Sequence, residues 1–487
     1  VATRVAARLA AALQTRVGVR ELFDTPTVAD LARALGGQAG GVVPELVAGP
    51  RPERVPLSLA QQRLWFLNRY DPQSAAYNMP WALRLTGVLD VSALSAALVD
   101  VLERHEALRT RYPEHDGVAY QQVLPTAQVI DGVAVVDVDR DRLSEAVTAF
   151  GATGFDVTTD ALVRVGLFAV TPVEHVLVLV VHHINADGFS MAPFARDVMS
   201  AYRARLHGQA PSWTALPVQP ADFALWQRAV LGTESDPESL LARQTRYWQS
   251  VLSELPEESA LPLDRPRPSV ASHRGDSVGF ELDPVLVERI EQLGRAHQAS
   301  VLMVLHAALA VVLTRLSADP GNDIAVGTPV AGRGHSALDD VVGMFVNTLV
   351  LRAEVHDSES VTELLTRIRR GDLDAFAHAD VPFERIVELL NPERSGARHP
   401  LFQVMLAFQD LGEIEFGLDG LEVSPFPAPV STIKFDLEFT VVPRPAAQGG
   451  DMALTIGYAT DLFDTRTVHE IGTRLLRVLE AFVTDPR

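Results

Sequence analysis

The chain has 487 residues and carries 42 Lys and Arg against 62 Asp and Glu, which gives a formal net charge of −20. Hydrophobic residues make up 47% and charged residues 21%, the composition of an ordinary globular protein. At roughly 150 residues per domain, the length allows about three domain-sized units. The surplus of negative charge argues against nucleic acid or an anionic membrane as the main partner, since both favour a basic surface.

Cysteine is absent from the sequence, which excludes disulfides, thiolate metal sites and a cysteine nucleophile. Apolar residues recur at four-residue spacing from Val1 to Leu13, the pattern of an amphipathic helix rather than of a signal peptide. The longest apolar run, Val301 to Leu313, is interrupted by His306 and is too short to span a bilayer. These features favour a cytoplasmic protein.

Residues 1–36 have a helical pattern and form the first predicted unit. Thr25-Pro26-Thr27 supplies the cap of a short helix, and Gly36-Gly37 ends it. About 35 residues make a thin core for a helical bundle, so the pattern predicts that the chain starts in the middle of a domain. The Gly- and Pro-rich residues 37–56 form a predicted linker.

From Pro56 onward the sequence alternates between strand and helix patterns, which predicts an α/β fold of helices layered on sheets. The predicted strands are 81–85, 161–170, 175–183, 278–282, 324–329, 401–408, 435–442 and 452–458, and the predicted helices are 91–104, 190–206, 236–254, 300–316 and 468–483. Residues 208–275 are rich in Pro, Trp and charge. We expect them to connect two lobes of similar build, of roughly 200 residues each.

The most informative stretch is VLVLVVHHINADGFS, at residues 176–190. Neighbouring side chains on a strand point to opposite faces, so His182 and His183 cannot converge on one metal ion. A histidine at the end of a buried strand, next to a helix expected to begin at Ser190, is well placed for proton transfer. Backbone N–H groups around Gly188 can face developing negative charge. The alternative is a pair of ordinary core histidines.

The string from His182 to Gly188 (HHINADG) resembles the signature of condensation domains of nonribosomal peptide synthetases. Six further blocks resemble that family and appear in its order: 58–67 (SLAQQRLWFL), 104–111 (RHEALRTR), 221–227 (ADFALWQ), 342–348 (VGMFVNT), 378–384 (HADVPFE) and 398–403 (RHPLFQ). Ala221 stands where the family often has Tyr. The resemblance implies two chloramphenicol-acetyltransferase-like lobes in a V-shaped pseudo-dimer, with an N-lobe at 57–215 and a C-lobe at 216–487.

Residues 1–36 resemble the C-terminal part of a peptidyl carrier domain, which is a helical bundle. The resemblance places the serine that would carry 4′-phosphopantetheine before Val1, outside this sequence. The implied partners are donor and acceptor carrier domains loaded with aminoacyl or peptidyl thioesters, and a neighbouring adenylation domain. No metal, nucleic acid or membrane is implied.

The resemblance also assigns a reaction, in which the amine of an acceptor aminoacyl thioester attacks a donor thioester to form an amide. His183 is the implied catalytic residue. A free α-amine has a pKa of about 7.7–8.0, so deprotonating it at pH 7 costs only about 1–1.5 kcal/mol. We therefore expect His183 to orient the amine and to relay the proton of the tetrahedral adduct, while Gly188 lets backbone donors approach the thioester.

Other residues near the motif have implied structural roles. His182 is expected to support the site, and Asp187 is expected to pair with Arg109. Two further arginines of the same block compete for that role, Arg104 and Arg111. Ser190 and Asn347 are candidates to line the channel between the lobes, although an ordinary buried role suits Asn347 better.

Several related activities fit the sequence less well. A heterocyclisation domain would have aspartates in place of the two histidines, and a non-catalytic recruitment domain typically loses the second one. An epimerisation domain shares the histidines but usually continues Asp-x-Val-Ser-Trp, whereas this sequence continues Asp187-Gly188-Phe189-Ser190. An acyltransferase that uses coenzyme A and a docking platform without chemistry also remain alternatives.

Overall fold

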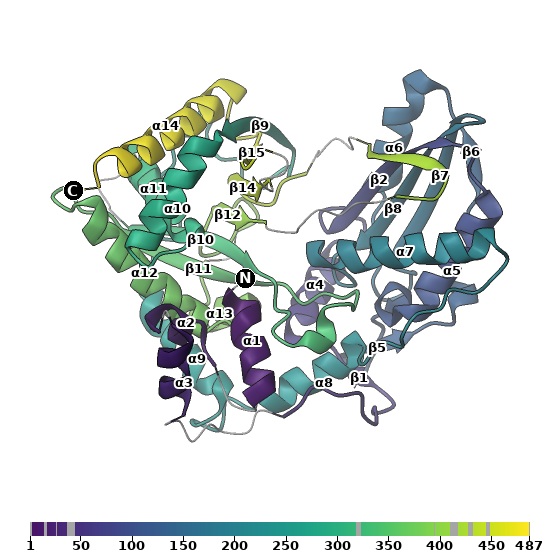
Figure 1. Cartoon of the computed structure of the whole chain (residues 1–487), viewed down its shortest axis with the longest axis horizontal. Coiled ribbons are helices and arrows are strands. Elements are labelled where there is room, and N and C mark those ends of the chain that lie inside the picture. Colours follow the sequence, from purple (N-terminus) through teal and green to yellow (C-terminus); the bar gives the residue numbers. More distant parts are fainter. Residues whose placement is uncertain are drawn as a thin grey trace.

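The computed structural model describes residues 2–13, 17–25, 27–36, 44–317, 323–393, 395–409, 417–426, 432–444 and 449–486. Two lobes of mixed α/β structure meet at one end and diverge at the other, so the outline is a V (Figure 1). Each lobe is built on its own sheet. The predicted α/β fold with two lobes is therefore confirmed.

The N-lobe is a five-stranded sheet between two layers of helices. Its strand order is β13 (Leu421–Pro425), β2 (Asn78–Gly87), β8 (Glu174–His182), β7 (Val163–Thr171) and β6 (Val135–Asp137). Helices α5 (Val91–Arg104) and α7 (Met191–Leu206) pack on one face, and α4 (Leu59–Tyr70) and α6 (Leu143–Ala152) pack on the other. The motif strand β8 lies in the middle of this sheet.

Strand β8 shows why its sequence is an unbroken apolar run. All nine of its residues are buried. Leu177, Leu179 and Val181 contribute to the core under α5 and α7, whereas the alternate residues Val176 to Val180 contribute to the core on the opposite face. Because both faces of the sheet are covered, the strand has no polar face.

The C-lobe is a six-stranded sheet that is also covered on both faces. Its strand order is β11 (Asn347–Glu354), β10 (Asp323–Val330), β12 (Val404–Phe408), β14 (Leu437–Pro443), β15 (Met452–Ala459) and β9 (Gly275–Leu282). One face carries α10 (Pro284–Ala296), α11 (Val301–Leu316), α12 (Val361–Ala377) and α14 (Thr465–Thr484). The other carries α9 (Leu240–Val251) and α13 (Phe383–Leu390).

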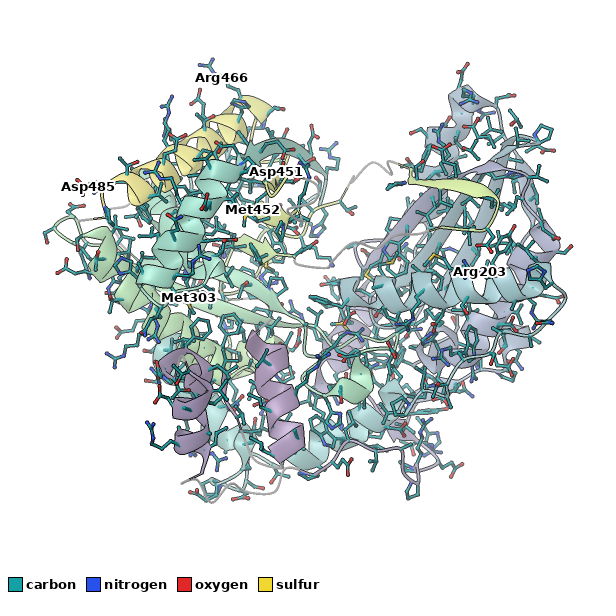
Figure 2. The ribbon with its side chains drawn as sticks, viewed as in Figure 1. Arg203, Met303, Asp451, Met452, Arg466 and Asp485 are labelled. Carbon is teal, nitrogen blue, oxygen red and sulfur yellow. The ribbon has the colours of Figure 1, made fainter. Side chains whose placement is uncertain are left out.

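One strand crosses from the second half of the chain into the N-lobe. Strand β13 pairs antiparallel with β2, from Leu421 opposite Gly87 to Pro425 opposite Leu83. Arg203, which projects from α7 (Figure 2), binds Asp419 just before this strand through Nε and Nη2, each at 2.8 Å. The predicted boundary between 215 and 216 therefore does not hold for β13, because backbone pairing places this strand in the other lobe.

The segment between the sheets contains two helices, α8 (Pro220–Leu231) and α9, where the pattern predicted one at 236–254. A small sheet beside the N-lobe contains β1 (Val55–Pro56), β5 (Val118–Val123), β3 (Thr110–Arg111) and β4 (Glu114–His115). The 3-10 turns are η1 (Glu106–Arg109), η2 (Thr126–Gln128), η3 (Arg140–Arg142), η4 (Gly188–Ser190) and η5 (Ser336–Leu338).

Three short helices precede the lobes: α1 (Ala2–Leu13), α2 (Val19–Asp24) and α3 (Val28–Leu35). The Thr27 side chain accepts the Asp30 N–H and caps α3, as predicted. Helix α2 lies against α12 of the C-lobe, where Arg20 binds Asp374 at 2.7 Å. Of the predicted linker 37–56, residues 44–56 are described and form no helix.

Within the described part of the chain, no single helix is both long and apolar enough to cross a bilayer. Helices α10 and α11 would meet that test only together, and the chain bends by 101° between them.

Candidate active site

The two histidines of the motif lie at the carboxyl end of β8 and differ in exposure. His182 is the last residue of the strand and is only 1% exposed, whereas His183 is half-buried. Nδ1 of His182 accepts the Ile184 N–H at 3.2 Å, and its ring contacts Phe155 edge-on. Burial lowers the pKa of His182 to about 3. His182 is therefore a neutral, fixed core histidine, and its supporting role in the reaction stays a prediction.

His183 is positioned by its backbone. Its N–H donates to the Tyr77 carbonyl oxygen at 2.8 Å, and its Nδ1 is buried with no hydrogen-bond partner among the described residues. Burial, and then the positive charge of Lys434, lower the pKa of His183 to about 4, while Asp187 acts in the opposite direction. The imidazole is consequently neutral near pH 7 and able to accept a proton.

Asp187 is held in a fully buried network that joins the two lobes. Its Oδ1 accepts hydrogen bonds from the Ser190 N–H (2.9 Å), the Ser190 hydroxyl (2.9 Å) and the Arg333 guanidinium (3.0 Å). Its Oδ2 accepts the Phe345 N–H at 3.0 Å. Arg333 and Phe345 come from the C-lobe, so Asp187 fixes the loop after His183 to the opposite lobe.

The predicted pairing of Asp187 with Arg109 is wrong. The Arg109 guanidinium instead donates to the backbone carbonyls of Leu102 and Leu124, at 3.2 and 2.9 Å. The two competitors are engaged elsewhere as well, Arg104 with Asp197 and Arg111 with Gln122. Because the actual partner, Arg333, lies 146 residues downstream in the other lobe, no local spacing could identify it.

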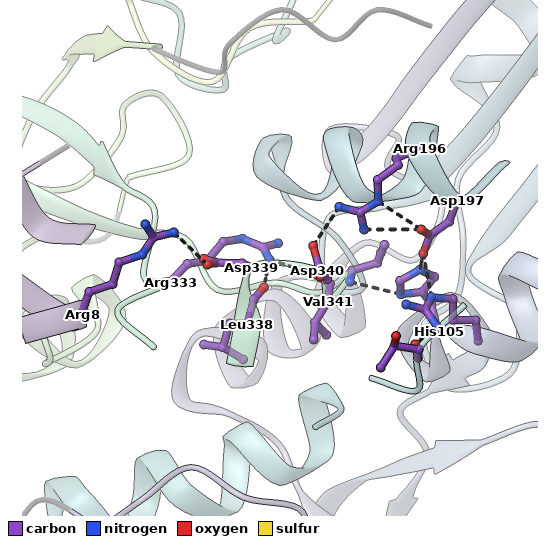
Figure 3. A network of polar contacts seen from close by, with 12 residues as sticks. Arg8, His105, Arg196, Asp197, Arg333, Leu338, Asp339, Asp340 and Val341 are labelled. Carbon is purple, nitrogen blue, oxygen red and sulfur yellow. Dashed lines mark hydrogen bonds and ion pairs between the residues drawn. The ribbon is translucent and has the colours of Figure 1, made fainter. Parts of the chain in front are cut away.

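Arg333 organises the C-lobe segment that it joins to the motif (Figure 3). It donates to the carbonyl oxygens of Leu338 (2.6 Å) and Val341 (2.7 Å), and its guanidinium lies 4.6 Å from the centre of the Phe345 ring. The following residue, Val342, donates its N–H to Nδ1 of His105 at 3.3 Å. The segment from Arg333 to Phe345 is therefore tied to the N-lobe at several points.

The remaining predicted site residues have separate positions. Ser190 is fully buried and its hydroxyl oxygen also accepts the Gly343 N–H, so it does not line a channel. Asn347 is half-buried, and its side-chain amide binds the backbone of the turn before α13. Gly188 is exposed, and a Cβ added there would meet no atom within 4 Å. Open space therefore adjoins the motif at Gly188.

Six side chains from the two lobes form what we call the interlobe cluster: Arg63, Tyr77 and His183 from the N-lobe, and Glu384, His399 and Lys434 from the C-lobe. Each side chain is half-buried. Arg63 on α4 lies 3.6 Å from Glu384 on α13, and Lys434 Nζ lies 4.1 Å from the centre of the Tyr77 ring. The cluster therefore bridges the lobes beside His183.

Burial affects the titration of this cluster strongly. It raises the pKa values of Tyr77 and Glu384, and it lowers those of His399 to about 3 and Lys434 to about 8. Sequence reasoning assigned no role to these residues other than His183, although Arg63, Glu384 and His399 fall within quoted blocks. Lys434 falls within none.

Comparisons with known proteins show the family to which this chain belongs. The family model for the condensation domain matches residues 52–487. The chain is 47% identical over its whole length to CymA, a probable non-canonical nonribosomal peptide synthetase of Salinispora arenicola, and 44% identical to a dimodular nonribosomal peptide synthase of Bacillus subtilis. It spans 6% and 20% of the length of these two relatives.

Solved structures agree in fold. The X-domain from teicoplanin biosynthesis superposes with a TM-score of 0.84 at 36% identity, with 91% of this chain and 98% of that one covered. The first condensation domain of the calcium-dependent antibiotic synthetase, in complex with a substrate analogue, gives a TM-score of 0.70 at 22% identity, over 89% and 98% of the two chains, which supports the fold alone.

The chain belongs to the condensation domain family of nonribosomal peptide synthetases, a family of amide-forming acyltransferases. Its lobes have the chloramphenicol-acetyltransferase-like fold that the resemblance implied. The first 51 residues lie outside the family model, and their interpretation as part of a carrier domain stays a prediction.

Proposed function

We propose that this chain joins a donor aminoacyl or peptidyl thioester to an acceptor aminoacyl thioester, which forms an amide on the acceptor carrier and frees the donor carrier's thiol. The observation that carries this proposal is His183, a neutral imidazole within the interlobe cluster. Asp187 and Arg333 fix the loop that follows it across the two lobes. Residues 1–36 would be the end of a carrier domain, and the enzyme would act in the cytoplasm with its carriers and a neighbouring adenylation domain.

The substrates arrive as thioesters on the phosphopantetheine arms of carrier domains, and a thioester supplies a good leaving group. The open space beside Gly188 suits such an arm, since no side chain or backbone atom of the described residues occupies it. Gly188 and the backbone around it would hold the thioester end. The substitution of Gly188 by any larger residue would fill this space.

His183 has one role before bond formation and one after it. Its ring first orients the acceptor amine toward the donor carbonyl carbon. As the C–N bond forms, the carbonyl electrons move to oxygen and the nitrogen becomes cationic. His183 then accepts the nitrogen proton, the oxygen electrons return, the C–S bond breaks, and the proton passes to the departing thiolate. General acid–base help of this kind contributes about 10²–10⁴ in rate.

The reaction class can be tested with purified chain, a donor and an acceptor aminoacyl thioester, each loaded on a separate carrier domain. We expect a dipeptidyl thioester on the acceptor carrier, detected by mass spectrometry, that requires both substrates. His207→Ala, at an exposed histidine on the N-lobe, serves as the control variant and should form the same product. Donor racemisation without an amide would instead establish epimerisation.

A second function has one specific observation in its favour. The teicoplanin X-domain is 36% identical to this chain, and another structure of it is a complex with OxyB. A domain that only recruits a partner would bind it without forming an amide. The thioester assay separates the two functions, because a recruitment domain leaves both substrates unchanged.

A further inference from the structure

Lys434 is exceptional in the composition of the chain. The sequence contains 42 Lys and Arg, of which 41 are Arg and this residue alone is Lys. Forty-one positions therefore use a guanidinium, which forms forked hydrogen bonds with carboxylates, and one position uses a compact ammonium. That position lies in the interlobe cluster, just before β14.

The surroundings of Lys434 leave its hydrogen-bond donors free. Its Nζ lies 4.1 Å from the centre of the Tyr77 ring, a cation–π contact across the lobes. The same Tyr77 accepts the His183 N–H through its carbonyl oxygen. Lys434 has no hydrogen bond or ion pair with any described residue. Its Nζ is not fully buried, so this atom keeps some contact with solvent. The ammonium is therefore accessible and available.

We propose that Lys434 is a further catalytic residue, which donates a hydrogen bond to the oxygen of the donor carbonyl as negative charge develops there. This inference rests on the proposed function, since it concerns the same reaction. The acceptor nitrogen forms its bond to the carbonyl carbon, and the carbonyl electron pair moves to the oxygen facing Lys434. His183 takes the nitrogen proton and passes it to the thiolate when the C–S bond breaks. Lys434 keeps its own protons throughout.

In this mechanism His183 and Lys434 have different tasks, which follow from their different charges. A neutral imidazole accepts a proton, and a cation stabilises negative charge. Preorganised donors aimed at a developing oxyanion are commonly the largest single contribution to acyl transfer, and loss of one costs about 10²–10³ in rate. The positive charge of Lys434 also lowers the pKa of His183, so the imidazole is neutral before the reaction begins.

The charged groups that face Lys434 come from several elements. Glu438 on β14 favours the ammonium, and Arg63 on α4 opposes it. His182, His183 and His399 are each affected by its charge. Burial is the main influence and lowers the pKa of Lys434 to about 8. The ammonium therefore predominates at pH 7 and is lost above about pH 8.

The alternative is a structural role, in which Lys434 only anchors Tyr77. The first test measures single-turnover condensation of carrier-bound substrates by wild type, Lys434→Met, Lys434→Arg and His183→Ala. We expect Lys434→Met to be slower by about 10²–10³. The wild-type rate should also fall above about pH 8, whereas Lys434→Arg, whose charge persists, should keep its smaller rate constant up to pH 9.

Two results would overturn the proposal. One is a Lys434→Met rate within threefold of wild type under conditions where His183→Ala is slow. The other is an equal decline of wild type and Lys434→Arg above pH 8. Absence of product with wild type itself would instead count against the proposed function, so the two failures are distinguishable.

A second test does not depend on activity or on the folding of a methionine variant. Reductive methylation with ¹³C-formaldehyde labels one lysine in this chain besides the N-terminal amine, and the signal missing from Lys434→Arg identifies it. We expect this signal to titrate near pH 8 and to shift when a non-hydrolysable amide analogue of acyl-pantetheine is added. Titration near pH 10 together with no response to the analogue would contradict a position at the reacting carbonyl.

Discussion

Adjacent histidines in one motif have different environments because they stand at the end of a buried strand. His182 packs into the N-lobe core, and His183, one residue further, belongs to the interlobe cluster. Burial disfavours the charged form of both rings. A base that remains neutral at pH 7 suits a reaction whose harder step is removal of a proton from a cationic adduct.

The protonation of these rings can be measured directly. We expect His182 and His183 to stay neutral down to about pH 5 in ¹⁵N-histidine NMR spectra, because burial lowers their pKa values to about 3 and 4. The histidines of the chain unfolded in urea should titrate near pH 6.5 and provide the reference. A His183 titration at pH 6.5 or above would contradict the environment described.

Gly188 can be tested apart from folding. The substitution Gly188→Ala should change the free energy of unfolding by less than about 0.5 kcal/mol, because the added methyl group meets no atom within 4 Å. Condensation should nevertheless fall, since the methyl group enters the space proposed for the thioester. Full activity in this variant would show that the substrate lies elsewhere.

Gly332→Ala is the matched control for the previous substitution. Gly332 has a φ of +62°, and an added Cβ would lie 1.8 Å from the Phe345 carbonyl oxygen. This variant should be strongly destabilised in chemical denaturation, unlike Gly188→Ala. The comparison separates a glycine that the backbone requires from one that the substrate requires.

Among structural elements, the contact between the motif loop and the Arg333–Phe345 segment links the lobes most directly. Removing one partner of a buried ion pair leaves an uncompensated charge, which costs about 3–5 kcal/mol. We therefore expect Asp187→Ala to lose stability by that amount in urea unfolding. Asp340→Ala, which breaks the exposed pair with Arg196, should cost less than about 1 kcal/mol.

The same pair can be examined by a double-mutant cycle. If Asp187 and Arg333 stabilise each other, Arg333→Met should cost less stability once Asp187 is replaced by Ala than it costs in wild type. Additive losses in the double variant would mean that the two side chains act independently, contrary to their 3.0 Å contact.

Local sequence signals predicted many elements well. Helix α5 spans the predicted residues 91–104, because Asp90 caps it and its apolar residues share one face. Helix α12 was not predicted, although Ser360 and Glu363 form a capping box at its start. Strand β13 and the Arg333 partnership could not be predicted, since both depend on pairing between distant segments from different lobes.

At the scale of the whole molecule, several buried histidines make stability depend on pH. His399, whose pKa burial lowers to about 3, stacks on Phe383 in the C-lobe and accepts no proton in the folded state near pH 5. The unfolded chain does take up that proton below about pH 6.5. The contribution of His399 to the free energy of unfolding is therefore complete above pH 6.5 and is lost as the pH falls toward 3.

Replacement of His399 by Phe isolates this effect. The variant should keep an aromatic side chain in the stack but lose proton uptake in the unfolded state. Relative to wild type, its free energy of unfolding should rise by about 2 kcal/mol between pH 7 and pH 5. Urea unfolding at the two pH values measures this, and a difference that does not change with pH would mean that the folded His399 titrates normally.

The V-shaped arrangement explains why so little of the site was visible in any one block of sequence. Arg63 and Tyr77 come from the start of the N-lobe, His183 from its centre, and Glu384, His399 and Lys434 from the C-lobe. The sequence blocks were enough to indicate the family and to single out His183. The other residues of the interlobe cluster can be recognised only when the two lobes are seen together in the structure.

The measurement that tests the account most directly is the single-turnover rate of dipeptide formation by His183→Ala, with donor and acceptor supplied on carrier domains and His207→Ala as the control. We predict a rate lower than wild type by about 10²–10⁴, with an unchanged unfolding transition. A folded His183→Ala protein that forms dipeptide at the wild-type rate would contradict the claim that this imidazole moves the proton.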